Sequence, residues 1–362
     1  MKRINQLTWA LSFLGLSSLA LAYAGTTQAV TQNVAPNMIP TLTPGFGITL
    51  TGLYLQPSAS GGNLTYATYT SPTPIDSPSW RQENTDPKYH GAFDLGLQYT
   101  MADTTDQVKL DWMYFNSTDL ASATSTGTDS VAPPYSFGPG AQFSGGSANT
   151  SAHFQINNIN LTLDHLINVS SNIQMTVFDG ISTAYLKEGL TSSYLGNTHP
   201  TGSPNDLTPF DITSYNTSEF TGIGPRLGLD TAYFFTPRWS VVGEMAGSLL
   251  IGSIKTTTNF RTLSAGTTLN TTLANQKNTA VVPEFNGKMG VTYALPLNTQ
   301  GSVLTLQAGY MVVIYLNGIT QVNPTQLVPD TEDNGVIAII ADAQTASDLG
   351  LNGPYASLTY TF

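Results

Sequence analysis

The sequence predicts an all-β protein: a transmembrane antiparallel β-barrel of about ten strands, with long extracellular loops and short periplasmic turns. Three observations predict it: an export signal, a shortage of charged residues, and repeated segments in which apolar and polar residues alternate. Charged residues make up only 10% of the chain, whereas water-soluble domains are typically about one quarter charged. A surface that largely faces lipid explains this shortage, because charge is costly there.

The N-terminus has the features of a cleaved export signal. Lys2 and Arg3 precede an apolar run from Leu7 to Leu21, and Ala22 and Ala24 form an A-x-A cleavage site. The run is shorter than the roughly 20 residues that a membrane-spanning helix needs. We therefore expect a signal peptide over residues 1–24, a periplasmic segment over 25–44, and an outer-membrane barrel over 45–362.

Charge and cysteine content exclude several classes of protein. The formal net charge is −11, and removal of Lys2 and Arg3 with the signal makes it −13. Such acidity argues against a nucleic-acid partner. The absence of cysteine excludes disulfides and thiolate metal sites, and no cofactor or metal is expected. After the signal, no apolar run reaches roughly 18 residues, which excludes a helical membrane protein.

Alternation with period two is clearest between Ala92 and Phe115. Polar residues such as Asp94 and Gln98 alternate with apolar residues. Polar and apolar residues also alternate in the segment QVKLDWMYF, which follows the short polar turn ADTTD. Two amphipathic strands joined so closely form a hairpin. The expected outward faces are Phe93, Leu95, Leu97, Tyr99 and Met101 on the first strand and Val108, Leu110, Trp112 and Tyr114 on the second.

The same unit recurs along the chain and predicts an even number of strands, as single-chain bacterial barrels have. The other expected strands are Phe46–Gln56, Asn158–Leu166, Ile173–Leu186, Gly222–Phe235, Trp239–Ile254, Glu284–Leu295, Val303–Leu316 and Tyr355–Phe362. Long polar connections alternate with the short turns and are expected to be extracellular loops. These long connections are Pro57–Pro87, Thr118–Thr150, Thr191–Thr213, Thr257–Asn278 and Gly318–Gly350.

The chain ends in an alternating strand, YASLTYTF, that finishes on the aromatic Phe362. This ending is similar to the C-terminal signal by which outer-membrane proteins engage the barrel-assembly machinery. An unpaired apolar edge would be a liability in water, and barrel closure removes it. Aromatic residues beside an expected turn indicate an interfacial girdle, although each alone fits the core of a soluble protein equally well. These residues are Tyr233, Phe234, Phe235 and Trp239.

The segment from Thr221 to Gly252 resembles the Legionella major outer membrane protein family. It contains a G-x-G-P-R-x-G strand from Gly222 to Gly228, a turn, and a second strand that ends in S-L-L-x-G from Ser248. The segments GLYLQP, FDLGLQYT, KLDWMYF and SDLGLNGPYASLTYTF are also similar. The resemblance implies an abundant, porin-like, surface-exposed protein. The chain departs from the family pattern at Leu55 and Ser182 and in having no cysteine.

If the faces are assigned correctly, nine charged residues point into the lumen. Rings of charge select ions in pores, and an acidic excess favours cations. Lumen charges also form paired networks in narrow barrels, and a salt bridge between Arg226 and Glu244 is at least as well supported by their neighbouring strands. The candidates are Asp94, Lys109, Asp111, Asp164, Arg226, Asp230, Glu244, Glu284 and Lys288.

Two features do not fit a simple amphipathic barrel. The segment from Gly335 to Ala343 is unusually apolar for a surface loop, and we expect it to fold inward as a plug through Val336, Ile337, Ile339 and Ile340; contact with a partner or with lipid is the alternative. Asp179 falls on the face assigned to lipid, so a bulge at Gly180 or a different register is expected there.

Nothing in the sequence indicates an enzyme: there is no G-x-S-x-G elbow and no metal-spaced histidine pair. The four histidines, His90, His153, His165 and His199, are expected in solvated or interface positions. The preferred hypothesis is a porin-like barrel that passes small solutes or ions. The alternative is an adhesin or structural protein whose closed barrel anchors binding loops, and an outer-membrane hydrolase is a distant third. Outer-membrane lipid and lipopolysaccharide are the expected partners, with a host-surface ligand and a second copy of the chain left open.

Overall fold

The computed structural model describes residues 39–362 apart from 41–43, 62–63, 72–78, 103, 128, 135–141, 200–207, 265–266, 275–276, 298–301 and 330–336. The expected signal peptide lies outside the described residues, as does most of the expected periplasmic segment. No helix of the described part of the chain is long and apolar enough to cross a membrane.

The described residues form fourteen β-strands. Four pairs of long strands meet at short connections, which follow Thr100, Asn168, Phe234 and Pro296. The strands are β1 Gly45–Ala59, β2 Thr65–Ser71, β3 Ser79–Asn84, β4 His90–Thr100, β5 Asp106–Thr124, β6 Ser130–Ala132, β7 Gln142–Asn168, β8 Ile173–His199, β9 Thr208–Phe234, β10 Trp239–Ser264, β11 Thr267–Ala274, β12 Asn278–Pro296, β13 Val303–Pro329 and β14 Ile337–Thr361.

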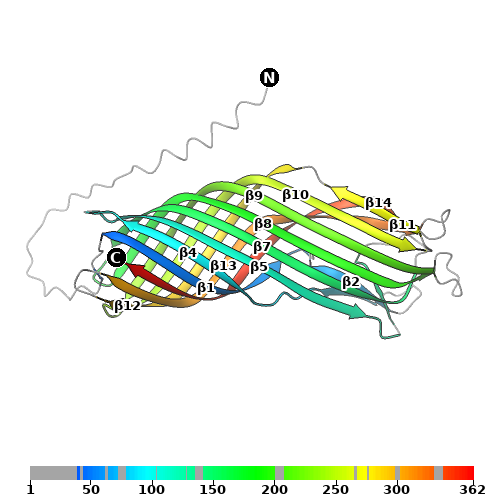
Figure 1. The fold of residues 1–362 in the computed structure, drawn as a ribbon, viewed down its shortest axis with the longest axis horizontal. Coiled ribbons are helices and arrows are strands. Elements are labelled where there is room, and N and C mark those ends of the chain that lie inside the picture. The colour runs from blue at the N-terminus through cyan, green and yellow to red at the C-terminus, as the bar shows by residue number, and fades with distance from the viewer. Residues whose placement is uncertain are drawn as a thin grey trace, which may run out of the picture. The chain divides into compact units, whose positions relative to one another are not determined.

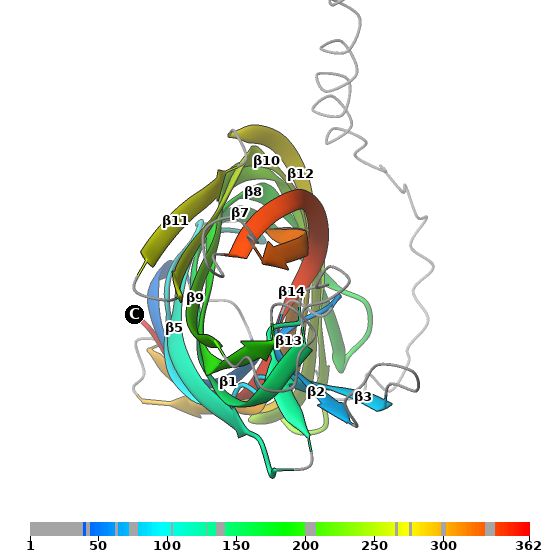
Figure 2. The ribbon, with the colours of Figure 1, turned by 90° about the vertical axis from the view of Figure 1, so that its right-hand side faces the viewer.

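Ten of these strands close into an antiparallel ring in the order β10-β12-β13-β14-β1-β4-β5-β7-β8-β9, because β9 also pairs with β10 (Figures 1 and 2). β11 adds to the far end of β10 only, where Thr257–Ser264 pairs with Thr267–Ala274. β2 lies between β3 and β6 in a separate small sheet. The ring confirms the predicted class, a ten-stranded antiparallel barrel. Closure satisfies the backbone groups that hydrocarbon would otherwise leave unpaired.

The two ends of the barrel sequence meet in the wall. β1 pairs with β14 on one side and with β4 on the other. The Phe46 amide donates to the Phe362 carbonyl at 3.0 Å, and the Phe362 amide donates to the Phe46 carbonyl at 2.9 Å. The C-terminus therefore lies beside the start of β1 (Figure 1). The terminal strand predicted from YASLTYTF is the strand that closes the ring.

The predicted alternation sets the two faces of the wall. Outward side chains near the short turns are apolar and exposed, as a surface against lipid requires, for example Leu97, Ile181 and Met245. On β8 and β9 this apolar band ends near Ile181 and Ile223. Beyond it most outward residues are polar, although Leu195 and Tyr215 are exposed there too, and Lys187 Nζ pairs with Glu219 Oε1 at 2.8 Å. The walls thus continue past the membrane-spanning segments into water.

The expected aromatic girdle has exposed members beside the turn between β9 and β10. Tyr233, Phe235 and Trp239 are each nearly half exposed, and Trp239 packs on Tyr293 of β12 with ring centroids 4.7 Å apart. At the same end, Phe46 packs on Tyr99 at 4.8 Å. Aromatic rings at this level suit the boundary between lipid tails and water.

The long connections were predicted incorrectly as loops over much of their length. β8 and β9 run through most of Thr191–Thr213, while β10 and β11 fill most of Thr257–Asn278. Strands also occupy much of the other three, including β2 and β3 in Pro57–Pro87, β6 in Thr118–Thr150, and the ends of β13 and β14 in Gly318–Gly350. These strand ends are rich in Thr, Ser and Asn because their outer face meets water. The apolar alternation that signals a strand is therefore weak there.

The prediction for Asp179 was also wrong. β8 pairs with β7 and β9 without a register shift at this point, and Asp179 lies opposite Leu163 and Leu227. The carboxylate is outward and exposed within the apolar band. Neither a bulge at Gly180 nor a different register removes it from the lipid-facing surface.

Candidate functional site

The structure places all nine predicted lumen residues around one cavity of about 300 Å³. The cavity lies inside the ring, because the alternation of each strand points the charged set inward. Its lining also includes Gln174, Ala232 and Thr359, which lie close to the short turns. We call this space the chamber; it occupies the end of the lumen that faces the periplasm when short turns are periplasmic.

One side of the chamber is held by Lys109 of β5. Its Nζ lies 2.6 Å from Oδ2 of Asp164 on β7 and 3.8 Å from Oδ2 of Asp230 on β9. Asp164 is 1% exposed and also accepts a hydrogen bond from Thr162 Oγ1 at 2.6 Å. Lys109 therefore links strands that are not neighbours in the wall, and it compensates a carboxylate that would be costly to bury alone.

The other side is organised by Arg226 of β9. Its Nη1 lies 3.3 Å from Oε1 of Glu284 and donates to Ser248 Oγ at 3.2 Å. The predicted contact with Glu244 is present but longer, at 3.8 Å, and Glu244 lies closer to Lys288 Nζ, at 3.3 Å. Register explains the difference: Glu244 is directly opposite Asp230 and Lys288, whereas Arg226 is opposite Ser248.

The chamber keeps an excess of negative charge. Among its nine Asp, Glu, Lys and Arg residues, three are cationic and six are acidic. Among the described residues, no salt bridge reaches Asp94 or Asp111, although both line the cavity.

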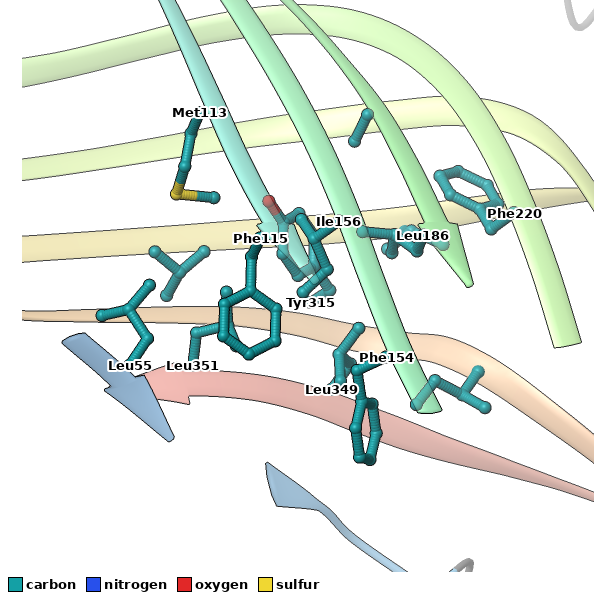
Figure 3. Packing of buried hydrophobic residues seen from close by; sticks show 14 of the residues in the cluster. Leu55, Met113, Phe115, Phe154, Ile156, Leu186, Phe220, Tyr315, Leu349 and Leu351 are labelled. Atoms are coloured by element: carbon teal, nitrogen blue, oxygen red, sulfur yellow. The ribbon is translucent and has the colours of Figure 1, made fainter. Parts of the chain in front are cut away.

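Above the chamber the lumen is filled with apolar side chains, which we call the apolar layer. Leu53, Met113 and Tyr355 belong both to it and to the lining of the chamber, so the layer forms the ceiling of the cavity. Figure 3 shows how side chains from opposite parts of the ring meet. Labelled there are Leu55, Met113, Phe115, Phe154, Ile156, Leu186, Phe220, Tyr315, Leu349 and Leu351, each 6% exposed or less.

Sequence reasoning missed this layer, although a signal for it exists. Met113 and Phe115 continue the inward phase of Lys109 and Asp111 on one strand. Leu55 likewise continues the inward phase of Thr49 and Thr51. The inward face therefore changes from polar to apolar partway along the strands. We expected a polar lumen face on each strand.

The extracellular part of the lumen is occupied as well. Ile319–Pro329 of β13 pairs with Ile337–Ser347 of β14 and forms what we call the arm. The Thr320 amide donates to Ser218 Oγ of β9 at 3.0 Å, and Thr258 Oγ1 of β10 donates to the Val322 carbonyl at 2.6 Å. Ser218 and Thr258 are inward residues of the wall, so the arm crosses inside the ring. In Figure 2 the orange and red ends of β13 and β14 lie within the outline of the ring.

The predicted plug belongs to this arm. Ile337 and Ile339 pair with Pro329 and Leu327, and Ile340 lies in the same strand, so this segment is a strand and the predicted loop was wrong. Val336 lies outside the described residues. The role of the four residues as a plug stays a prediction.

A second element packs on the inner wall near the same end. The small sheet contributes Tyr66, Ala67 and Val131 to a buried cluster with the inward Tyr194 and Ile212, among others. Tyr194 Oη donates to the Tyr66 carbonyl at 2.6 Å. Beyond the membrane-spanning part of the wall, strands of the same chain therefore pack against the inner face of the ring.

The histidines do not form a metal site or a recognisable catalytic group. His90 Nε2 lies 3.0 Å from Asp119 Oδ1, His165 Nδ1 lies 2.6 Å from Asp106 Oδ1, and His153 bonds to Thr118. His199 pairs through its backbone at the end of β8. Within the described part of the chain, no three His, Asp or Glu side chains gather as metal ligands do.

A closed ten-stranded ring with an apolar outer band and a charged lumen defines an outer-membrane β-barrel protein. The chain belongs to the Legionella pneumophila major outer membrane protein family, whose model matches residues 38–362. It is accordingly an outer-membrane protein, as predicted. No curated protein matches the chain.

Several solved structures are similar to this chain at low sequence identity. The Escherichia coli outer membrane protease OmpT shares 10% identity at a TM-score of 0.40, covering 89% of this chain and 99% of that one. A Pseudomonas aeruginosa FadL homologue shares 10% identity at a TM-score of 0.23, with 88% and 90% covered. The Pseudomonas putida toluene transporter TodX shares 7% identity at 0.24, with 88% and 90% covered.

Proposed function

We propose that this protein is a surface-exposed structural barrel whose closed interior anchors an extracellular wall and its inserted strands. The apolar layer is the observation that carries the proposal. Leu55, Phe115, Phe154 and Tyr315 are among its side chains with no exposed surface. Burying one such side chain is worth about 2 kcal/mol, so opening a path past only five of them costs about 10 kcal/mol. A freely open pore is the less favourable interpretation.

The length of the walls supports a role at the cell surface. A membrane-spanning strand needs about 9–11 residues, whereas β7, β8 and β9 have 27 residues each. The excess lies on the side away from the short turns and carries the small sheet and the arm. Binding of a host-surface ligand there, contact with lipopolysaccharide, association of copies, and engagement of the assembly machinery through the strand ending in Phe362 stay proposals. We propose no catalytic role.

A gated, cation-selective, porin-like passage is the second candidate, and the chamber favours it. An acidic cavity in the half of the lumen near the turns is more than an anchor requires, since a closed barrel can be filled entirely by neutral side chains. Such a passage has to displace both the apolar layer and the arm. It therefore conducts rarely, in brief events.

Planar-bilayer recording of the purified chain tests the proposal. A closed anchor gives no conductance above the lipid baseline, at neutral pH and over hours of recording. Steady steps in every bilayer would contradict it. Rare cation-selective events that disappear in the double variant Asp94→Asn and Asp111→Asn would favour the second candidate. Thr217, outward on β9, provides the control substitution Thr217→Val, which should change neither result.

A further inference from the structure

The arm is joined to the ring by an irregular connection. The β13–β14 pairing shifts register between Tyr315 and Ile319, so the ladder is interrupted just before the arm begins. Asn317 lies there with a φ of 54°, a conformation unusual for a residue other than glycine. Its amide donates to Asp348 Oδ1 at 2.9 Å. The regular β13–β14 ladder is therefore interrupted where the arm meets the ring, and inside the ring the arm is held by separate contacts such as that of Thr320 with Ser218.

Directly beneath the arm lies Glu188 of β8, which points inward and is 2% exposed. It sits opposite Phe154 of β7 and Ser218 of β9 in the wall. Gln321 of the arm hydrogen-bonds to its side chain, and the neighbouring arm residue Thr320 bonds to Ser218. Among the described residues, the Oε1 atom of Glu188 has no hydrogen-bond partner and no cation pairs with the carboxylate. A buried carboxyl group therefore touches the arm without a compensating charge from this part of the chain.

We propose that Glu188 is a protonation-dependent latch: its neutral carboxyl keeps the arm docked inside the ring, and its ionised carboxylate releases the arm. The proposal concerns the extracellular end of the lumen. It holds whether or not the barrel conducts, because Leu55, Phe115 and Phe154 of the apolar layer belong to the ring and not to the arm.

The surroundings of Glu188 make its ionisation costly. The side chains that face it are Phe154 of β7, Ser218 of β9 and Gln321 of the arm, and none of these is charged. The adjacent charged residues Lys187 and Glu219 point outward and pair with each other. Asp348, at the base of the arm, accepts the Asn317 amide. An ionised Glu188 can be stabilised only by water, and water reaches the carboxylate when the arm leaves.

Burial raises the pKa of Glu188 from the ordinary 4.5 to about 8, and the hydrogen bond with Gln321 offsets part of this rise. Glu188 lies beyond the apolar band, outside the membrane-spanning part of β8. A raised pKa means that the docked arm holds the proton more tightly than the released arm. Docking is therefore strongest below pH 4.5, weakens about tenfold per pH unit from 4.5 to 8, and is constant above 8.

Because the chain has no cysteine, a single introduced thiol reports on the arm. Ile319→Cys places it at a position that is 1% exposed when the arm is docked. The test is its rate of reaction with a membrane-impermeant maleimide, measured in lipid vesicles in the unsubstituted and the Glu188→Gln backgrounds. Dividing the rate in the unsubstituted background by the rate in the Glu188→Gln background at each pH removes the effect of pH on the thiol itself.

We expect this ratio to rise about tenfold per pH unit between pH 5.5 and 7.5, because the amide introduced by Glu188→Gln cannot ionise and keeps the arm docked. Glu219→Gln is the matched control: it makes the same change on the water-facing side of the neighbouring strand, and its rates should equal those of the unsubstituted background. A ratio that stays near one over this range overturns the proposal.

Hydrogen exchange on the unsubstituted chain gives a result that does not depend on any variant folding. Once corrected for the intrinsic effect of pH, protection of the Thr320 amide should fall about a hundredfold from pH 5.5 to 7.5. Protection of the Leu161 amide, within the wall, should stay constant over the same range. Equal and constant protection at both sites would also overturn the latch.

Discussion

The two halves of the lumen solve the same packing problem with different chemistry. Near the short turns, the inner walls carry charged residues that compensate one another across the ring, as Lys109 does for Asp164 and Asp230. Toward the other end, the walls carry apolar side chains, then hydroxyl and amide groups, with Glu188 as a buried carboxylate that no cation compensates. The first half depends on pairs of charges. The second depends on burial and on neutral hydrogen bonds.

The two halves should therefore be destabilised by different kinds of substitution. A buried ion pair is held together chiefly because each partner would be costly alone. An apolar layer loses stability in proportion to the volume removed. Neutral hydrogen bonds each contribute least, since water replaces them on release. The three kinds of contact should therefore respond to substitution in that order.

The largest effect is expected from Arg226→Met, which leaves Glu284 at 1% exposure without its cation. Leaving a buried charge uncompensated costs about 3–5 kcal/mol. Urea unfolding in lipid vesicles, followed by tryptophan fluorescence, measures this loss. Arg238→Met, in the exposed turn after β9, is the control and should cost less than about 0.5 kcal/mol. An equal effect of both substitutions would remove the distinction between the two halves.

Much of the fold could be predicted from the sequence, and the reason is local. The outer face that contacts lipid requires strict alternation of apolar and polar residues. The strand containing Phe93 to Tyr99, and the orientation of its side chains, could therefore be predicted. The nine charged lumen residues follow from the same phase, and the chamber gathers them. The pairing of Arg226 could be predicted only in part, because it depends on a register with β10 and β12 that no local pattern encodes.

The extracellular half could not be predicted for physical reasons. Once the outer face leaves lipid, both faces of a strand tolerate Thr, Ser and Asn, and the alternation disappears. The sequence pattern therefore predicts loops where the long ends of β8 and β9 lie. The apolar layer requires residues from β1, β5, β7, β13 and others to meet in space. Such a meeting depends on closure of the ring, a property of the whole chain rather than of any one segment.

A second, smaller effect is expected from Leu55→Ala in the apolar layer. Leu55 has no exposed surface, so its truncation leaves a cavity and costs about 2–4 kcal/mol. Leu50→Ala makes the same change on the same strand at a lipid-facing position that is 55% exposed, and it should cost under about 1 kcal/mol. The same unfolding assay compares them. A larger loss at Leu50 would show that the interior contributes less stability than the lipid face.

The smallest effect is expected from Thr258→Val, which removes the hydroxyl that donates to the Val322 carbonyl of the arm at 2.6 Å. The same hydroxyl also bonds to Asn216 Oδ1 of β9. Valine keeps the shape of threonine, so the change removes only neutral hydrogen bonds of one hydroxyl, each worth about 1 kcal/mol. Because this bond ties the arm to β10, its loss should appear as faster hydrogen exchange around Val322 and leave the unfolding midpoint of the ring nearly unchanged. Thr257→Val, at the neighbouring outward position, should alter neither. If Thr258→Val instead unfolded the whole barrel at lower urea, the arm would be part of the cooperative core and not a unit that can leave it. The division between the two halves of the lumen would then not separate the arm from the ring.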